Sequence, residues 1–177
     1  MGLNHHRGPV KNKEEMLEVV KHAFHAGVRM FDTAEVYGPY TNEELVGEAI
    51  EGFRHEIQLA TKGGFKINGQ SNYPDSSKET LRRSLEGSLK RLKTDYIDLY
   101  YIHRIDPTVP IEEVAQTMQE FKKEGKILHW GLSEANAETI RRAHKIEPLS
   151  AVQSEYSIWW RELEKEVMPT LEELGLG

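Results

Sequence analysis

Short apolar runs alternate with longer amphipathic segments along the chain. The short runs are rich in β-branched and aromatic residues, which is typical of strands that are buried on both faces. They lie at residues 29–31, 57–61, 96–102, 127–132 and 151–152. This alternation predicts an α/β fold in which parallel strands are joined by helices that cover the sheet.

The segments between the runs carry apolar residues at helical spacing, most clearly over residues 81–92. The Gly- and Asn-rich stretch 63–75 follows a strand and lacks such spacing, so it is predicted to be irregular and is a candidate to line a site. Residues typical of helix ends mark where the predicted helices begin and end. Helices are expected to start at Asn12, Thr41 and Ser76, each followed three residues later by Glu, and to stop at Gly27, Gly125 and Gly175.

The composition excludes several classes of function. The length of 177 residues suits one domain, spanning residues 1–177. A net charge of −6 argues against nucleic acid or an anionic membrane as a partner. No run of about 18 apolar residues predicts a membrane span, and no apolar signal segment is seen, so a cytoplasmic location is expected. The absence of Cys and of suitably spaced His argues against disulfides, thiol catalysis and a metal site.

Polar residues fall at the ends of the predicted strands. Asp32, Lys62, His103, Ser133 and Gln153 each end or follow a different strand. In a parallel sheet the carboxyl ends of all strands lie at one edge, where α/β proteins place their sites. Each residue alone has a structural explanation, such as a cap, a solvated charge or a core amide. Five of them at one edge predict a functional site.

The residue types at this edge suit proton transfer to a carbonyl oxygen. Tyr37 lies five residues after Asp32, and its phenol, with an ordinary pKa near 10, is a poor acid at neutral pH. A nearby Lys62 cation would lower that pKa, and Asp32 would hold the lysine in place. Protonating a developing alkoxide is the task of a carbonyl reductase. Gly-rich phosphate loops and a G-x-S-x-G elbow are absent from the sequence.

Four spaced motifs resemble those of the aldo-keto reductases, in the family's order. The segment GVRMFDTAEVYG at residues 27–38, followed by NEELVG at 42–47, resembles the family's first signature. ATK at residues 60–62 resembles its lysine strand, and YIDLYYIH at 96–103 resembles its histidine strand. KILHWGLS at residues 126–133 resembles the stretch that leads to the nicotinamide contacts.

The resemblance implies an activity and a role for each residue. It implies a (β/α)8 barrel that uses NADP(H) to reduce an aldehyde or ketone, a small-molecule carbonyl substrate, to an alcohol without a metal. By position, Tyr37 would be the general acid, and Lys62, paired with Asp32, would lower its pKa. His103 would orient the carbonyl group by a hydrogen bond.

The same resemblance assigns Ser133 and Gln153 to the cofactor's carboxamide. Glu134 and Ala135 stand where many members have Asn and an aromatic residue, a departure next to this contact. A complete barrel needs about 250 residues. The chain therefore resembles an incomplete barrel, with strands 2–6, the end of strand 1 near residues 1–3, and the last two βα units absent. Such a sheet exposes its edges, which predicts one of three outcomes: an oligomer formed through them, marginal stability, or a barrel opened into a sheet.

Two other functions stay open at this point. The first is a non-enzymatic or inactive binding or regulatory module on an aldo-keto reductase scaffold, because one fold hosts many functions. The second is a doubly wound fold that binds another ligand where its strand order reverses, although the sequence has no Gly-rich fingerprint for it.

Overall fold

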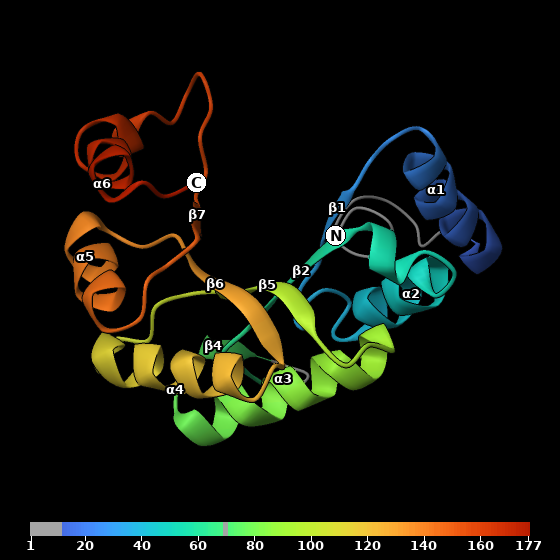
Figure 1. Cartoon of the computed structure of the whole chain (residues 1–177), viewed down its shortest axis with the longest axis horizontal. Coiled ribbons are helices and arrows are strands. Elements are labelled where there is room, and N and C mark those ends of the chain that lie inside the picture. The colour runs from blue at the N-terminus through green and yellow to red at the C-terminus, as the bar shows by residue number, and fades with distance from the viewer. Residues whose placement is uncertain (1–11, 69–70) are drawn as a thin grey trace.

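Five parallel strands form the central sheet of this computed structural model, which describes residues 12–68 and 71–177 (Figure 1). The strand order is β1-β2-β5-β6-β7. The strands are β1 (Met30–Asp32), β2 (Gln58–Gly63), β5 (Ile97–Ile102), β6 (Ile127–Ser133) and β7 (Ala151–Gln153). Each apolar run of the sequence is therefore a strand, and the predicted parallel α/β arrangement is confirmed.

Helices cover the outer side of the curved sheet, as Figure 1 shows. They are α1 (Lys13–His25), α2 (Thr41–Ile50), α3 (Lys78–Leu92), α4 (Ile111–Lys123), α5 (Ala137–Ile146) and α6 (Val167–Leu174), with short 3-10 turns at Arg54–Glu56 and Glu162–Glu164. The core lies between the sheet and the helices. Leu81 and Leu85, on the apolar face of α3, are buried there in one cluster with Met118 and Phe121 of α4. Each fully buried side chain of this size contributes about 1.5–3 kcal/mol to stability.

The stretch expected to be irregular contains a small antiparallel hairpin, so that prediction was wrong. Strands β3 (Phe65–Ile67) and β4 (Asn72–Pro74) pair with each other and stay outside the main sheet. Gly64 turns the chain out of β2 with a φ of +95°, a conformation that favours glycine. The Asp75 N–H donates to the Gly64 carbonyl at 2.9 Å and closes the base of the hairpin.

Two predicted helix caps are displaced by one residue. Helix α2 begins at Thr41 itself, and its N-cap is Tyr40, with a φ of 71°. Helix α3 is capped by Ser77, whose side chain accepts a hydrogen bond from the helix, while the Ser76 N–H donates to Asp106 at 3.0 Å. The Ser76 hydroxyl is buried and has no hydrogen-bond partner among the described residues. The cap at Asn12 is confirmed, as are the left-handed glycines at the helix stops, Gly27, Gly125 and Gly175.

The sheet curls so far that its two outermost strands meet at their carboxyl ends. Gln153 of β7 donates from Nε2 to Asp32 Oδ2 of β1 at 3.3 Å. Beside β7, on the side away from β6, the backbone of Gly177 bonds to Val152 and Ser150. The strand end predicted near residues 1–3 lies outside the described residues. Pairing of sheet edges between copies of the chain stays a prediction.

Candidate active site

The five polar residues predicted at the strand ends lie at one edge of the sheet. Asp32 is the last residue of β1, and Lys62 is the last but one of β2. His103 directly follows β5, and its backbone N–H is held by the end of β2. Ser133 and Gln153 end β6 and β7 and are partners in the strand register. Because the strands are parallel, their carboxyl ends collect these side chains on one rim.

An ion pair between a buried lysine and a partly exposed aspartate forms the base of the site. The Lys62 side chain is 1% exposed and its Nζ pairs with Asp32 Oδ1. The same Nζ donates to the Thr33 carbonyl at 2.8 Å. Burial lowers the pKa of Lys62, and the charge of Asp32 opposes this shift. A buried cation with two such partners has a fixed position, so Lys62 offers a charge at a defined point.

Tyr37 and His103 face this lysine. The Tyr37 ring lies edge-on to the His103 ring, with 5.8 Å between centroids and 84° between planes. Lys62 Nζ lies 5.2 Å from the centroid of the Tyr37 ring. The structure therefore brings a phenol, an ammonium group and an imidazole together, although they come from three different segments of the chain.

The pKa of Tyr37 is not lowered in this structure, although Lys62 lies beside its ring. Partial burial and the negative charge of Asp32 raise the pKa of Tyr37 above its usual range, and Arg104 opposes the rise. Burial and Asp32 thus favour the neutral phenol. Tyr37 thus keeps its proton at neutral pH and has one to donate.

His103 is held in its neutral form. Burial, followed by the positive charges of Lys62 and Arg104, lowers the pKa of His103 to about 3. Its Nδ1 is buried and has no hydrogen-bond partner among the described residues. A neutral imidazole carries one N–H donor and one acceptor nitrogen. His103 can therefore donate a hydrogen bond to a ligand oxygen without carrying a charge.

Two residues of the site escaped the sequence reasoning. Arg104 donates from Nη1 to Ser133 Oγ at 3.2 Å and to the His103 carbonyl at 2.6 Å. Arg104 follows His103 at the end of β5, and this position at the carboxyl edge could have marked it as a site residue. Phe65 of the hairpin lays its ring edge-on against His103, with centroids 5.2 Å apart. The stretch 63–75 was a candidate lining, but the sequence did not single out this aromatic residue.

Ser133 and Gln153 offer the right chemistry for a carboxamide. A primary carboxamide has one acceptor oxygen and an NH₂ donor, which a hydroxyl and a side-chain amide can satisfy together. Here Ser133 bonds to Arg104 and Gln153 bonds to Asp32.

Over residues 12–68 and 71–177, no cluster of three or more His, Asp or Glu side chains is placed to hold a metal ion. Within the same ranges no helix could cross a membrane.

Comparisons with known proteins agree on one family. The family model described as "Aldo/keto reductase family" matches residues 1–177. A probable aldo-keto reductase from Glycine max is 46% identical over 182 residues, which is 100% of this chain and 52% of that protein. A glycerol dehydrogenase structure from Gluconobacter oxydans has a TM-score of 0.89 at 30% identity. The match covers 99% of this chain and 54% of the dehydrogenase chain.

A third relative was solved with a cofactor. The structure of an aldo/keto reductase from Klebsiella pneumoniae in complex with NADP and acetate has a TM-score of 0.78 at 27% identity. The match covers 93% of this chain and 56% of the Klebsiella chain. The chain thus spans about half the length of these relatives. Its curled sheet matches an incomplete (β/α)8 barrel of the aldo-keto reductase structures, as the sequence predicted. The chain belongs to the aldo/keto reductase family.

Proposed function

We propose that the protein carrying this chain reduces an aldehyde or ketone to an alcohol, with NADPH as the hydride donor. The observation that carries the proposal is the meeting of Tyr37, the Lys62–Asp32 pair and His103 on one rim. Family membership and the NADP complex of the Klebsiella relative support the choice of reaction and cofactor.

Each side chain has one task in this reaction. Tyr37 gives its phenolic proton to the carbonyl oxygen as hydride reaches the carbonyl carbon, and solvent later returns a proton to the phenolate. Lys62 stabilises that transient phenolate, and Asp32 keeps the ammonium group in place. The N–H of His103 donates a hydrogen bond to the carbonyl oxygen and orients the substrate.

The chemistry of Ser133 and Gln153 fits the carboxamide of a nicotinamide. When bound, NADPH supplies the hydride. Ser133 and Gln153 would hold its carboxamide; Gln153 donates one N–H to Asp32, and its amide has a second N–H and a carbonyl oxygen for the ligand. Arg104 would keep Ser133 in place through the bond between them.

Replacing the proposed acid tests the function. With 4-nitrobenzaldehyde as substrate and NADPH consumption as the readout, Tyr37→Phe should lower kcat about 10²–10⁴-fold, the range typical of general acid catalysis. NADPH binding, followed by fluorescence titration, should be unchanged. Tyr73→Phe is the matched control, because Tyr73 lies exposed on β4.

Two results would contradict the proposal. Wild-type turnover in the Tyr37→Phe variant would show that the acid is another group. NADPH binding without turnover by the unmodified protein would favour a binding or regulatory module on this scaffold.

A further inference from the structure

Glu35 anchors the loop that carries Tyr37. Glu35 is buried, 2% exposed, and lies two residues before Tyr37. Its backbone N–H donates to the Lys62 carbonyl at 3.1 Å, and its carbonyl accepts from the Tyr40 N–H at 2.8 Å. The loop is therefore fixed to β2 just before Tyr37 and closed on itself just after it.

The carboxylate of Glu35 ties this loop to two further elements. Its Oε1 accepts from the Phe65 N–H of β3 at 3.1 Å and from Ser84 Oγ of α3 at 3.0 Å. A buried carboxyl group loses hydration that an apolar side chain would not need to lose. Burial accordingly raises the pKa of Glu35 to about 7. Core packing alone does not favour a carboxyl group at this position, because an apolar side chain would fill it without this loss of hydration.

The two segments joined by Glu35 both press an aromatic ring on His103. Tyr37 contributes one edge-on ring and Phe65 the other. Between the hairpin and α3 lies a cavity of about 400 Å³ that is lined by Glu35, Phe65 and Ser84, among others. Side chains do not fill this space, and the Glu35 carboxylate links loop, hairpin and helix beside it through its bonds to Phe65 and Ser84.

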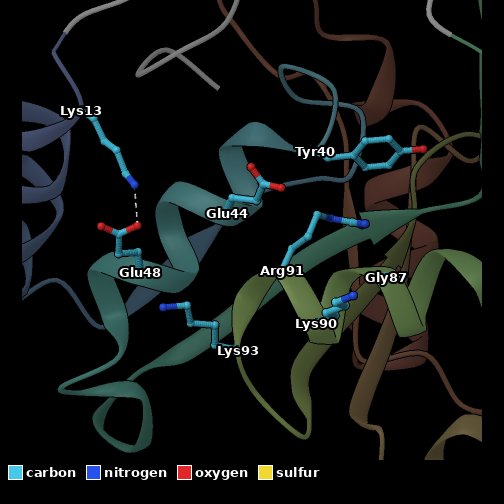
Figure 2. A pocket seen from close by; sticks show the side chains of 8 residues that line it. All are labelled: Lys13, Tyr40, Glu44, Glu48, Gly87, Lys90, Arg91 and Lys93. Carbon is cyan, nitrogen blue, oxygen red and sulfur yellow. Dashed lines mark ion pairs between the residues drawn. The ribbon is translucent and has the colours of Figure 1, made fainter.

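The far end of the loop is held independently. Figure 2 shows Tyr40 on the loop and Arg91 on α3 at a hollow of about 550 Å³. The Arg91 guanidinium carbon lies 4.5 Å from the centroid of the Tyr40 ring. Loss of the Glu35 carboxylate would leave the loop attached at Tyr40 and through its backbone hydrogen bonds, but would remove its links to β3 and α3 near Tyr37.

We propose that Glu35 is a positioning residue, whose carboxylate sets the placement of the Tyr37 and Phe65 rings against His103. The relevance of this placement to carbonyl reduction rests on the function proposed above. The inference needs no further ligand, because every contact in it belongs to the described residues.

Three variants of the intact protein test this role. Glu35→Leu removes both hydrogen bonds, whereas Glu35→Gln keeps a carbonyl oxygen that can accept both. Glu44→Gln, at an exposed position of α2, is the control. The readouts are kcat, the KM for NADPH and the NMR signals of the His103 ring protons, which report on neighbouring aromatic rings and are assigned by their absence in His103→Gln.

Glu35→Leu should shift the His103 ring signals and lower kcat about tenfold or more, as expected when a catalytic geometry is loosened. The KM for NADPH should stay unchanged, and Glu35→Gln should retain most of kcat together with the wild-type signals. If Glu35→Leu does not fold, Ser84→Ala, which removes one of the two bonds, should cause the same changes at smaller size.

The outcomes separate this inference from the reductase assignment. A folded Glu35→Leu, or Ser84→Ala in its place, with unmoved His103 signals and wild-type kcat would overturn the inference. Equal losses in Glu35→Gln and Glu35→Leu would also overturn it, since the acceptor oxygen would then not matter. Displaced His103 signals in a protein that never reduces a carbonyl would support the positioning role while the proposed function failed.

Discussion

Two arginines of α3 make ion pairs of the same length in very different surroundings. Arg91 Nε lies 2.7 Å from Glu43 Oε2, and Arg82 Nη2 lies 2.7 Å from Glu124 Oε1. The side chains of the first pair are 17% and 0% exposed, and those of the second are 36% and 35% exposed. The exposed pair has two nitrogen–oxygen contacts and the buried pair has one, so a larger effect of the buried pair would reflect burial rather than the number of contacts.

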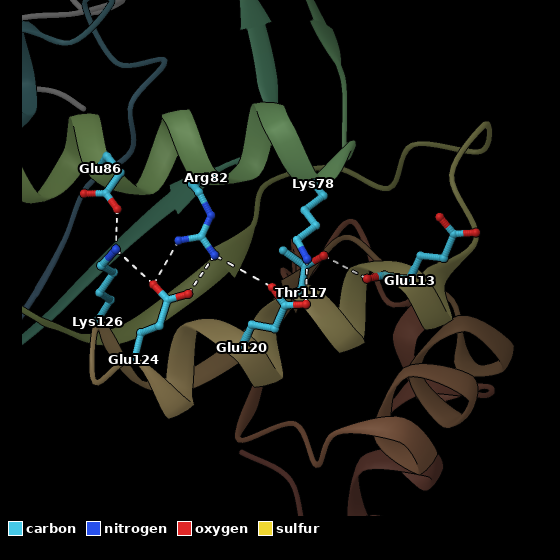
Figure 3. Close-up of polar contacts among 8 residues, drawn as sticks. All are labelled: Lys78, Arg82, Glu86, Glu113, Thr117, Glu120, Glu124 and Lys126. Atoms are coloured by element: carbon cyan, nitrogen blue, oxygen red, sulfur yellow. Dashed lines mark hydrogen bonds and ion pairs between the residues drawn. The ribbon is translucent and has the colours of Figure 1, made fainter.

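The Arg82 pair belongs to an exposed ladder between α3 and α4. Figure 3 shows three side chains of α3 facing partners on α4 or directly after it. The pairs are Lys78–Glu120, Arg82–Glu124 and Glu86–Lys126, with cross-links Arg82–Glu120 and Lys126–Glu124. Water solvates these charges equally well when the pairs are open, so each pair adds little to stability.

The Arg91 pair belongs to a buried cluster beside the active-site rim. Glu43 accepts from Arg91 through Oε2 and from Thr61 Oγ1 through Oε1, at 2.7 and 2.6 Å. Thr61 directly precedes Lys62 in β2, so the cluster joins α2, α3 and the strand that carries the lysine. A buried carboxylate without its cation is strongly unfavourable, and this asymmetry distinguishes the cluster from the ladder.

The largest effect on stability is expected from removing the buried cation. Arg91→Met keeps an apolar stem but leaves the Glu43 carboxylate buried, with Thr61 as its remaining hydrogen-bond partner among residues 12–68 and 71–177. The free energy of unfolding should fall by about 3–5 kcal/mol, as for other broken buried pairs. Urea unfolding at pH 7 measures this loss. A shift no larger than that of Arg82→Met would show that burial makes no difference here.

The sequence predicted the rim well because the rim depends on local patterns. An apolar run marks a buried strand, and the polar residue that ends it, such as Asp32 or His103, lies at the carboxyl edge by topology alone. No partner had to be known for this step. The pKa of Tyr37 could not be predicted in this way, because its shift depends on burial and on where the charges of Asp32 and Arg104 lie in space.

The buried polar residues behind the rim could not be predicted in this way. Asn42 and Glu43 lie in the first turn of α2, where the pattern predicts solvent-facing residues, yet both are buried. Their partners include Thr33 for Asn42 and Arg91 for Glu43. Arg91 is 48 positions from Glu43, and Phe65 and Ser84 are 30 and 49 positions from Glu35. Only tertiary packing makes these positions polar and internal.

An effect of intermediate size on the free energy of unfolding is expected from a change of pH. Two pKa values are lowered for different reasons, one by burial and one by pairing at the surface. Burial lowers the pKa of His103 to about 3, whereas hydrogen bonds from Arg82 and Lys126 lower that of Glu124 to about 2. In the unfolded chain His103 titrates near its ordinary pKa of about 6.5. The folded state therefore binds fewer protons, and stability present above pH 6.5 is lost as pH falls toward 3.

The contribution of His103 is isolated by a variant that cannot titrate. Between pH 6.5 and 4.5 the wild type should lose roughly 1 kcal/mol of unfolding free energy per pH unit relative to His103→Gln. Glu35, whose pKa is raised to about 7, acts with the opposite sign, but it is present in both proteins and cancels. Urea unfolding of both proteins at several pH values measures the difference. Parallel pH profiles would mean that His103 accepts a proton in the folded protein as easily as in the unfolded chain.

The smallest effect is expected from the exposed ladder. Arg82→Met removes the pairs with Glu124 and Glu120, but both carboxylates regain hydration and Lys78 and Lys126 remain beside them. The urea midpoint should move by less than about a third of the shift caused by Arg91→Met. Raising the salt concentration should shrink the Arg82→Met effect further, because exposed charges are screened, and should leave the Arg91→Met effect nearly unchanged. Equal salt dependence of the two variants would contradict the distinction between the buried and the exposed pair.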